Sequence, residues 1–126
     1  MILGTGSDLM EIRRIEESIE RYGERFLQRV FTPAEVEYCR RKVHNAAESF
    51  AARFAAKEAA AKALGTGIAQ GVAWTEIEVR RLPGQRPTLH FTGRAAERAA
   101  RMGVAHAHLT LSHSREVALA VVMLEN

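Results

Sequence analysis

Residues 53–67 read RFAAKEAAAKALGTG, and they decide the fold more than any other stretch of the chain. Alanine and unbranched side chains favour helix, which predicts a long helix over about 47–64 with Gly65 as its C-terminal stop. Glu58 and Lys62 are four residues apart and therefore share one face of that helix. By spacing alone, such a pair is most often a stabilising surface ion pair. The alternative is a carboxylate and a cation that together hold a metal ion against an anionic substrate.

Shorter elements are predicted on either side of this helix. Toward the N-terminus we expect a strand at 2–9, a helix at 11–22 that Gly23 interrupts, and a helix from Thr32-Pro33, with threonine as N-cap, to about Arg41. Toward the C-terminus we expect strands at 75–82, 88–91, 106–113 and 117–124, and a helix at 93–102 capped by Thr92. The last two strands form an antiparallel hairpin. This order predicts an α+β fold with a small, mainly antiparallel sheet, one long helix and several shorter ones.

The composition indicates one soluble domain. A length of 126 residues suits a single domain over 1–126, and a hydrophobic content of 47% is enough for a core. The net charge of +3 favours an anionic partner but is well short of a nucleic-acid-binding tail. Cys39 is the single cysteine, which excludes an internal disulfide framework and favours a reducing compartment. Since no signal-peptide pattern or membrane-length apolar run is present, we expect a cytoplasmic protein without a membrane partner.

Asp8, at the end of the first predicted strand, has two readings. Together with the glutamate three residues later, it gives the spacing of a helix N-terminal capping arrangement, which is favoured for these residues taken alone. The alternative is a metal ligand. Asp8 and Glu58 would then be two carboxylates, a number that suits Mg²⁺ when substrate phosphates and water complete its octahedron. Positive charge for the phosphates would come from Arg53, Lys57 and Lys62.

The first predicted helix separates its charges by sign. Its cations lie on a stripe beside the apolar face, at Arg14, Arg21 and Arg25, with Ser18 between them. The glutamates fall on the remaining side of the helix. An arginine face of this kind suits docking of an acidic surface, but an ordinary solvated helix with intrahelical ion pairs is equally expected. If Gly23 bends the helix, Arg25 leaves the stripe.

Ser112 and His113 lie where the first strand of the predicted hairpin meets its turn. A histidine at such a place is more often a surface or packing residue than a catalyst, and an adjacent serine does not make a nucleophilic triad. The other four histidines show no metal-ligand spacing with a carboxylate cluster. The residues alone therefore leave this corner of the chain without a role.

Five segments together resemble the bacterial holo-acyl-carrier-protein synthases, which belong to the 4'-phosphopantetheinyl transferases. They are GTGSDLMEIRRI at 4–15, FTPAE at 31–35, the stretch at 53–67, LSHS at 111–114 and ALAVV at 118–122. These segments span essentially the whole chain, in the order and at the spacing of that family. The resemblance reverses the readings above in favour of a functional site, because several weak motifs now coincide.

The resemblance implies the 4'-phosphopantetheinyl transferase fold and an activity. Members of the family move the phosphopantetheine arm of coenzyme A onto a serine of apo acyl carrier protein, and release adenosine 3',5'-bisphosphate, in fatty acid biosynthesis. Asp8 and Glu58 match the family's magnesium ligands, and Lys62 matches its lysine near the pyrophosphate. Glu58 and Lys62 are therefore the expected catalytic residues. Glu58, directly or through a metal-bound water, is our choice of base, and manganese would also suit the oxygen ligands.

The resemblance also implies the binding sites. The expected coenzyme-binding residues are Arg53, Lys62, Gly65, Ile68, Pro87, Ser112 and His113. Of these, Arg53 and His113 match positions associated with the coenzyme phosphates, whereas Gly65, Ile68 and Pro87 lie where the family forms its adenine pocket. The arginine stripe of Arg14, Arg21 and Arg25 falls on the helix that docks the acidic carrier protein. The family is typically a homotrimer with its sites between subunits.

Two other functions are weighed against this one. The first is a non-catalytic coenzyme-binding or structural protein of the same fold, which the presence of both Asp8 and Glu58 disfavours. The second is a small basic nucleic-acid-binding module. Because the chain has two tyrosines, one tryptophan and no basic tail, and mixes its cations with acids, we expect no nucleic-acid partner.

Overall fold

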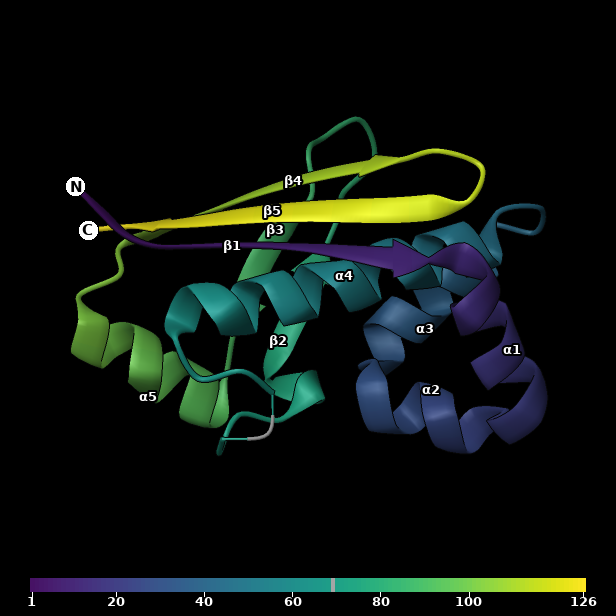
Figure 1. Ribbon diagram of the computed structural model, residues 1–126, viewed down its shortest axis with the longest axis horizontal. Helices are drawn as coiled ribbons and strands as arrows, with labels where there is room; N and C mark the ends of the chain where they lie inside the picture. Colours follow the sequence, from purple (N-terminus) through teal and green to yellow (C-terminus); the bar gives the residue numbers. More distant parts are fainter. Residues whose placement is uncertain (69) are drawn as a thin grey trace.

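The structure is a computed structural model that describes residues 1–68 and 70–126. Its helices and strands form an α+β fold (Figure 1). In chain order they are β1 (Ile2–Glu11), α1 (Ile12–Tyr22), α2 (Glu24–Val30), α3 (Pro33–Arg40), α4 (Ala46–Leu64), the 3₁₀ turn η1 (Trp74–Glu76), β2 (Ile77–Arg80), β3 (Thr88–Phe91), α5 (Gly93–Met102), β4 (His106–His113) and β5 (Val117–Glu125). The predicted α+β class, long central helix and antiparallel hairpin are confirmed.

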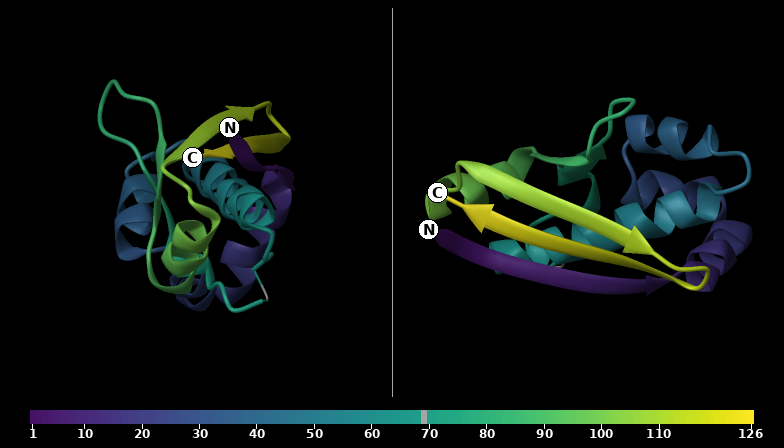
Figure 2. Two further views of the ribbon diagram at one scale, coloured as in Figure 1. Left: turned by 90° about the vertical axis from the view of Figure 1, so that its left-hand side faces the viewer. Right: turned by 90° about the horizontal axis from the view of Figure 1, so that it is seen from above.

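The long helix α4 lies against one face of an antiparallel sheet with the strand order β1-β5-β4. No other element among residues 1–68 and 70–126 covers the opposite face of this sheet, which is clearest in the view from above (Figure 2). β2 and β3 form a separate antiparallel ribbon, in which Ile77 pairs with Phe91 and Arg80 with Thr88. The short helices α1, α2 and α3 gather around the N-terminal half of α4, and α5 lies near its C-terminal end (Figure 1).

α4 is buried on most of its circumference, because its surface is mainly alanine. A helix that is apolar all round belongs in the core of a domain. Its buried alanines fall into two clusters, one under the sheet with Leu64, Val122 and Leu124, and one among α1, α2 and α3 with Phe31 and Phe50. The helix ends at Gly65, which adopts the left-handed conformation with φ 79° that is typical of a C-terminal glycine.

β1 lies directly on the backbone of α4, and two glycines make this approach possible. A methyl carbon placed on Gly6 would overlap the carbonyl oxygen of Ala59, and one placed on Gly4 would overlap that of Ala63. Residues two apart on a strand share a face, and residues four apart on a helix do the same. The contact therefore fixes β1 along α4, and it places Asp8, the next residue on that face of β1, beside the helix.

Gly23 separates α1 from α2. Its φ of 57° is one that glycine adopts without strain, and the chain turns there before α2 begins. The predicted interruption is thus confirmed. The predicted start of α3 is confirmed as well, because Thr32 and Glu35 form a reciprocal capping box, with the Thr32 amide donating to Glu35 Oε1 at 2.9 Å.

Three local predictions are wrong. The capping reading of Asp8 fails because β1 runs on to Glu11 and no side-chain cap is present at the start of α1. The strand predicted from residue 75 begins only at Ile77, after the 3₁₀ turn η1. Thr92 makes no side-chain cap on α5, because Glu76 of η1 takes that place and accepts the amide of Arg94 at 2.6 Å.

Candidate active site

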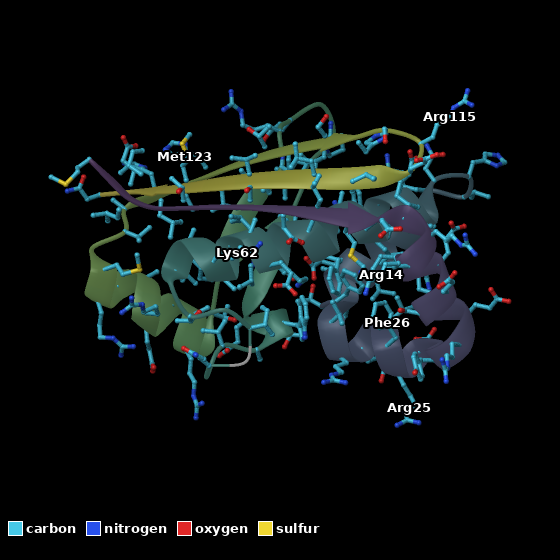
Figure 3. The ribbon with its side chains drawn as sticks, viewed as in Figure 1. Arg14, Arg25, Phe26, Lys62, Arg115 and Met123 are labelled. Atoms are coloured by element: carbon cyan, nitrogen blue, oxygen red, sulfur yellow. The ribbon has the colours of Figure 1, made fainter. Side chains whose placement is uncertain are left out.

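Asp8 and Lys62 meet between β1 and α4. The Lys62 ammonium lies 3.2 Å from Asp8 Oδ1 and donates to the carbonyl oxygen of Ser7 at 3.0 Å. Figure 3 shows Lys62 rising from α4 toward β1. These two residues are 54 positions apart in the chain, and the glycine contact of β1 brings them together. Within the described part of the chain, Lys62 therefore pairs with Asp8 and makes no ion pair with Glu58, contrary to the simplest reading of their spacing.

Glu58 completes this group, which we call the carboxylate site: Asp8, Glu58 and Lys62. Burial raises the pKa of the Glu58 carboxyl above its ordinary value, the charge of Asp8 raises it further, and the Lys62 ammonium opposes the rise. Two neighbouring carboxylates with one compensating lysine form a place where an added cation is favourable. A cation bound at this site would therefore offset the negative charge that Lys62 leaves uncompensated.

The carboxylate site fits a magnesium ion that is shared with a substrate. No group of three or more histidine, cysteine, aspartate or glutamate side chains among residues 1–68 and 70–126 could hold a metal ion. Asp8 and Glu58 alone cannot fill an octahedron, but Mg²⁺ is commonly held by one or two protein carboxylates together with phosphate oxygens and water. The donor set thus suits a hard divalent cation that arrives with, or is completed by, a phosphorylated ligand.

Lys57 is not available for a phosphate, and this part of the sequence prediction is wrong. Its side chain is 0% exposed and forms an ion pair with Glu35, with 2.7 Å between Lys57 Nζ and Glu35 Oε1. Lys57 also donates to the backbone carbonyls of Trp74 and Ile77. The helix turns this side chain away from β1 and into the interior.

Arg53 and His113 line a second hollow, of about 280 Å³, on the other side of α4. We call it the basic hollow, because its cationic side chains are Lys42, Arg53 and Arg81, with His113 beside them. The Arg53 guanidinium is 4% exposed, stacks 4.1 Å from the centre of the Tyr38 ring and donates to Ser49 Oγ at 2.9 Å.

Two details of the basic hollow point to an anionic ligand. The buried Nε of Arg53 has no hydrogen-bond partner, which is costly unless a ligand supplies one. The acidic residue that lines the hollow is Glu48, whose Oε1 lies 3.0 Å from His113 Nδ1. The lining of the hollow thus offers more hydrogen-bond donors than acceptors to a ligand.

A third hollow, of about 350 Å³, lies between α1, α2 and α4. Its polar lining comes from Arg14, Glu17, Ser18 and Arg21, and its apolar lining from Met10, Ile15, Tyr22, Phe26 and Phe54. We call it the docking hollow. Arg25 does not line it, because Gly23 turns α2 away, and Figure 3 shows Arg25 well apart from Arg14 and Phe26.

The docking hollow adjoins the carboxylate site. Met10 follows Asp8 on the same face of β1, and Phe54 lies one helical turn before Glu58 on α4. A partner that is seated against Arg14 and Arg21 would therefore present its surface next to the carboxylates.

The remaining predicted coenzyme residues fall into two groups. Gly65 and Ile68 follow Lys62 at the C-terminal end of α4. Pro87 lies just before β3, at the end of the β2–β3 ribbon that is remote from η1, and Figures 1 and 2 show this turn far from the segment after Gly65. Ser112 is exposed on the outer face of β4, next to His113. One copy of the chain therefore does not bring Gly65, Ile68 and Pro87 together.

Comparison with known proteins identifies the family. A model of the 4'-phosphopantetheinyl transferase superfamily matches residues 4–122. The chain belongs to this superfamily. A holo-[acyl-carrier-protein] synthase of Koribacter versatilis is 56% identical over 126 residues, which are the whole of both chains.

Solved structures of this superfamily agree with the fold. The crystal structure of the holo-[acyl-carrier-protein] synthase from Neisseria meningitidis has a TM-score of 0.89 at 30% identity, and all of both chains is covered. The Bacillus anthracis synthase in complex with CoA (3',5'-ADP) has a TM-score of 0.82 at 37% identity, over 100% of this chain and 98% of that one. None of the helices described for this superfamily member is long and apolar enough to cross a membrane.

Sequence reasoning missed several residues of these hollows. Tyr38 and Lys42 of the basic hollow lie in and just after α3, whereas Arg81 directly follows β2, far from both in sequence, so periodicity alone gives no sign of their meeting. The place of Phe54 beside the carboxylate site could have been predicted, because Phe54 precedes Glu58 by one helical turn in residues 53–67. The same holds for Met10, because it follows Asp8 at the strand period of two.

Proposed function

We propose that this chain is a holo-[acyl-carrier-protein] synthase, which transfers 4'-phosphopantetheine from coenzyme A to a serine of apo acyl carrier protein. Adenosine 3',5'-bisphosphate is the other product, and we assign the reaction to fatty acid biosynthesis in the cytoplasm. The observation that carries the proposal is the carboxylate site, in which Asp8, Glu58 and Lys62 converge in a chain that matches named synthases over its full length.

Asp8 and Glu58 would hold a magnesium ion, which would supply positive charge for the pyrophosphate of coenzyme A and for the departing adenosine 3',5'-bisphosphate. Lys62 reaches the same place from α4 and adds a positive charge beside the oxygens on which negative charge develops. The hydrogen bond from Lys62 to Asp8 holds the ammonium beside the carboxylate that would bind the magnesium ion, which supports this role. The nucleophile comes from the carrier protein, and this chain needs no serine or cysteine of its own.

Glu58 is our candidate for the base that accepts the proton of the carrier serine. It belongs to the carboxylate site and lies one helical turn after Phe54 of the docking hollow, which is where the carrier serine would arrive. Burial and the charge of Asp8 raise the pKa of its carboxyl, whereas a bound cation would act in the opposite direction. Asp8 contributes to that rise and to the negative charge of the site. Glu58 then serves both in binding and in proton transfer.

The docking hollow would receive the carrier protein. Arg14 and Arg21 border its apolar floor, a combination that fits an acidic helix with an apolar stripe. Because Met10 and Phe54 connect this hollow to the carboxylate site, the docked partner can deliver its serine without a change in this chain. Arg25 lies outside the hollow and would contribute only long-range attraction.

We further propose a homotrimer in which neighbouring subunits share each coenzyme site. The carboxylate site is at the β1 edge of the sheet, and the basic hollow is at the opposite, β4 edge. A coenzyme bound to one carboxylate site would place its remaining phosphate in the basic hollow of the next subunit. In the trimer, the Gly65 segment of one subunit would also lie near the Pro87 turn of the next subunit.

The uncovered sheet face supports self-association. It exposes Leu9 at 65% and Met123 at 41%, and Leu119 and Val121 lie between them. Met123 projects from β5 away from α4 (Figure 3). This apolar stripe along β5 is flanked by exposed polar side chains of β1 and β4, such as Ser7, Thr110 and Ser112. A further copy of the same chain would offer a matching surface that covers the stripe.

The activity is tested by incubating the protein with coenzyme A, Mg²⁺ and an apo acyl carrier protein, and by measuring the intact mass of the carrier. We expect a gain of one phosphopantetheine group, which EDTA prevents. An unchanged carrier mass with Mg²⁺ present would overturn the proposed activity.

Sharing of the site is tested by subunit mixing. Asp8→Asn and Arg53→Ala should each be inactive alone, because each removes one half of every site. Trimers reassembled from both variants should recover part of the activity, since some sites then combine an intact carboxylate site with an intact basic hollow. A mixture that stays inactive after confirmed exchange of subunits would contradict shared sites.

A further inference from the structure

The ion pair between Glu35 and Lys57 is buried at the junction of α3, α4 and β2. Glu35 Oε1 accepts from Lys57 and from the Thr32 amide, and Glu35 Oε2 accepts the Val79 amide at 2.8 Å. The Lys57 ammonium has three protons, and its three acceptors are this carboxylate and the carbonyls of Trp74 and Ile77. Every polar atom of the pair therefore has a partner.

Stability alone does not explain such a pair. Removing two charges from water costs free energy that their attraction barely returns, and apolar side chains of similar volume are often as good or better in the same place. The best-attested advantage of buried polar groups is that they select one packing arrangement among several.

Such a selection of one packing arrangement matters for α4, because short alanine side chains make up most of its buried surface. Its buried residues are mostly alanine: Ala51, Ala52, Ala55, Ala56, Ala59, Ala60, Ala61 and Ala63. Helices pack by fitting ridges of side chains into grooves, and methyl groups make shallow ridges. Away from the glycine contact with β1, these shallow ridges therefore resist a small rotation or shift of the helix only weakly. The pair forms its specific bonds across α4 in only one position of the helix.

We propose that the Glu35–Lys57 pair sets the rotation and axial position of α4, and thereby positions Glu58 and Arg53 for transfer. Lys57 immediately precedes Glu58, and it shares a helix face with Arg53, one turn earlier. A small rotation of α4 would move Glu58 relative to Asp8, and Arg53 relative to the basic hollow, in the same step. Lys57 is thus a positioning residue, and this role rests on the proposed transferase function.

The test uses the double variant Glu35→Gln with Lys57→Met, which removes both charges and leaves no buried ion unpaired. We expect a folded protein whose kcat falls by roughly 100-fold at saturating substrates, since a displacement of about 1 Å at a reacting group has an effect of this size. The KM for carrier protein should change far less than kcat, because Arg14 and Arg21 lie on α1 and only Phe54 of the docking hollow lies on α4. Backbone amides in the middle of α4 should exchange their hydrogens faster than in the unchanged protein.

Leu124→Ala is the matched control. It truncates a fully buried side chain of β5 that packs near Leu64 at the C-terminal end of α4, away from Lys57, and it should lower the thermal midpoint without breaking the bonds that Lys57 makes. With all assays run well below both midpoints, this control should keep the unchanged protein's kcat. An inactive unchanged protein would instead refute the proposed function itself.

The positioning role is overturned if the double variant keeps the unchanged protein's kcat, or if Leu124→Ala loses kcat equally. Should the double variant fail to fold, Glu35→Gln alone decides the matter, because it keeps the shape of the side chain and one oxygen that can accept from either the Val79 amide or the Thr32 amide. A several-fold loss of kcat at full folding would then support the proposal. A lowered midpoint with unchanged kcat would reject it.

Discussion

Replacing Gly6 with alanine is expected to separate β1 from α4. Gly6 has an extended backbone that any residue adopts, so the substitution introduces no conformational strain. The added methyl carbon would, however, lie 2.9 Å from the Ala59 carbonyl carbon and 2.9 Å from the Ala63 amide nitrogen, and it would overlap the Ala59 oxygen. Ordinary contacts begin near 3.4 Å, so the strand must move by at least half an ångström.

The expected cost is at the upper end of the range for overpacking, about 3 kcal/mol, because both colliding groups are backbone and cannot rotate away. For a domain of this size, such a loss lowers the thermal midpoint by about 10 °C. Asp8 lies two residues further along the same face of β1, so the displacement reaches the carboxylate site. Transfer should therefore fall by roughly 100-fold even where the variant is folded.

Thermal unfolding followed by circular dichroism, together with carrier-mass assays below both midpoints, measures these effects. Gly103→Ala is the control, because it introduces backbone strain without a steric clash. Gly103 has a φ of 83°, and an added methyl group would meet no described atom within 4 Å. Strain alone should cost it about 1 kcal/mol and leave transfer intact. If Gly6→Ala melts no lower than Gly103→Ala and keeps full transfer, the close packing of β1 on α4 does not hold the site.

Three further predictions concern the carboxyl group, the docking face and a helix cap. Burial and the neighbouring carboxylate raise the pKa of Glu58 in the folded protein. Just above the ordinary carboxyl pKa, the folded protein therefore binds more protons than the unfolded one, and the free energy of unfolding falls as the pH rises from the ordinary to the raised pKa. Glu58→Gln should thus abolish transfer yet raise the thermal midpoint at pH 7 in EDTA, and a lowered midpoint would contradict the cause given for the shift. Arg14→Glu with Arg21→Glu should raise the KM for carrier protein and leave that for coenzyme A, whereas the same reversal at Arg29, exposed on α2, should change neither. Thr32→Ala removes a helix cap and a hydrogen bond to a glutamate of β2, and should cost about 2 kcal/mol, whereas Thr32→Ser should retain most of that stability.

Local sequence patterns predict most of the elements. The helix at 93–102 and the strand at 88–91 have the predicted bounds, because a C-terminal glycine and flanking turn residues fix their ends. The long helix is confirmed to within one residue at its N-terminal end, owing to its alanine content. Propensity and turn chemistry are local properties, and here the folded chain follows them.

The orientation of the long helix is not a local property. Alanine on every side gives no contrast between buried and exposed faces, so the sequence does not say which of Arg53, Lys57 and Lys62 turns inward. The structure answers this through Glu35 and Asp8, which reach the helix from α3 and β1. The phosphate-binding role assigned from charge alone was therefore wrong for Lys57. Asp8, Glu58 and Lys62, which the resemblance to a family grouped together, do lie close to one another, and their roles as metal ligands and catalytic residues stay predictions.

The central claim is that Asp8 and Glu58 form one metal-binding site on which transfer depends. Its most direct test measures carrier mass, and Mn²⁺ binding in the presence of coenzyme A by electron paramagnetic resonance, for the unchanged protein, Asp8→Asn and Glu58→Gln. Both variants should remain folded, bind the ion far more weakly and leave the carrier in its apo form. A folded variant that binds the ion and modifies the carrier as the unchanged protein does would contradict the account.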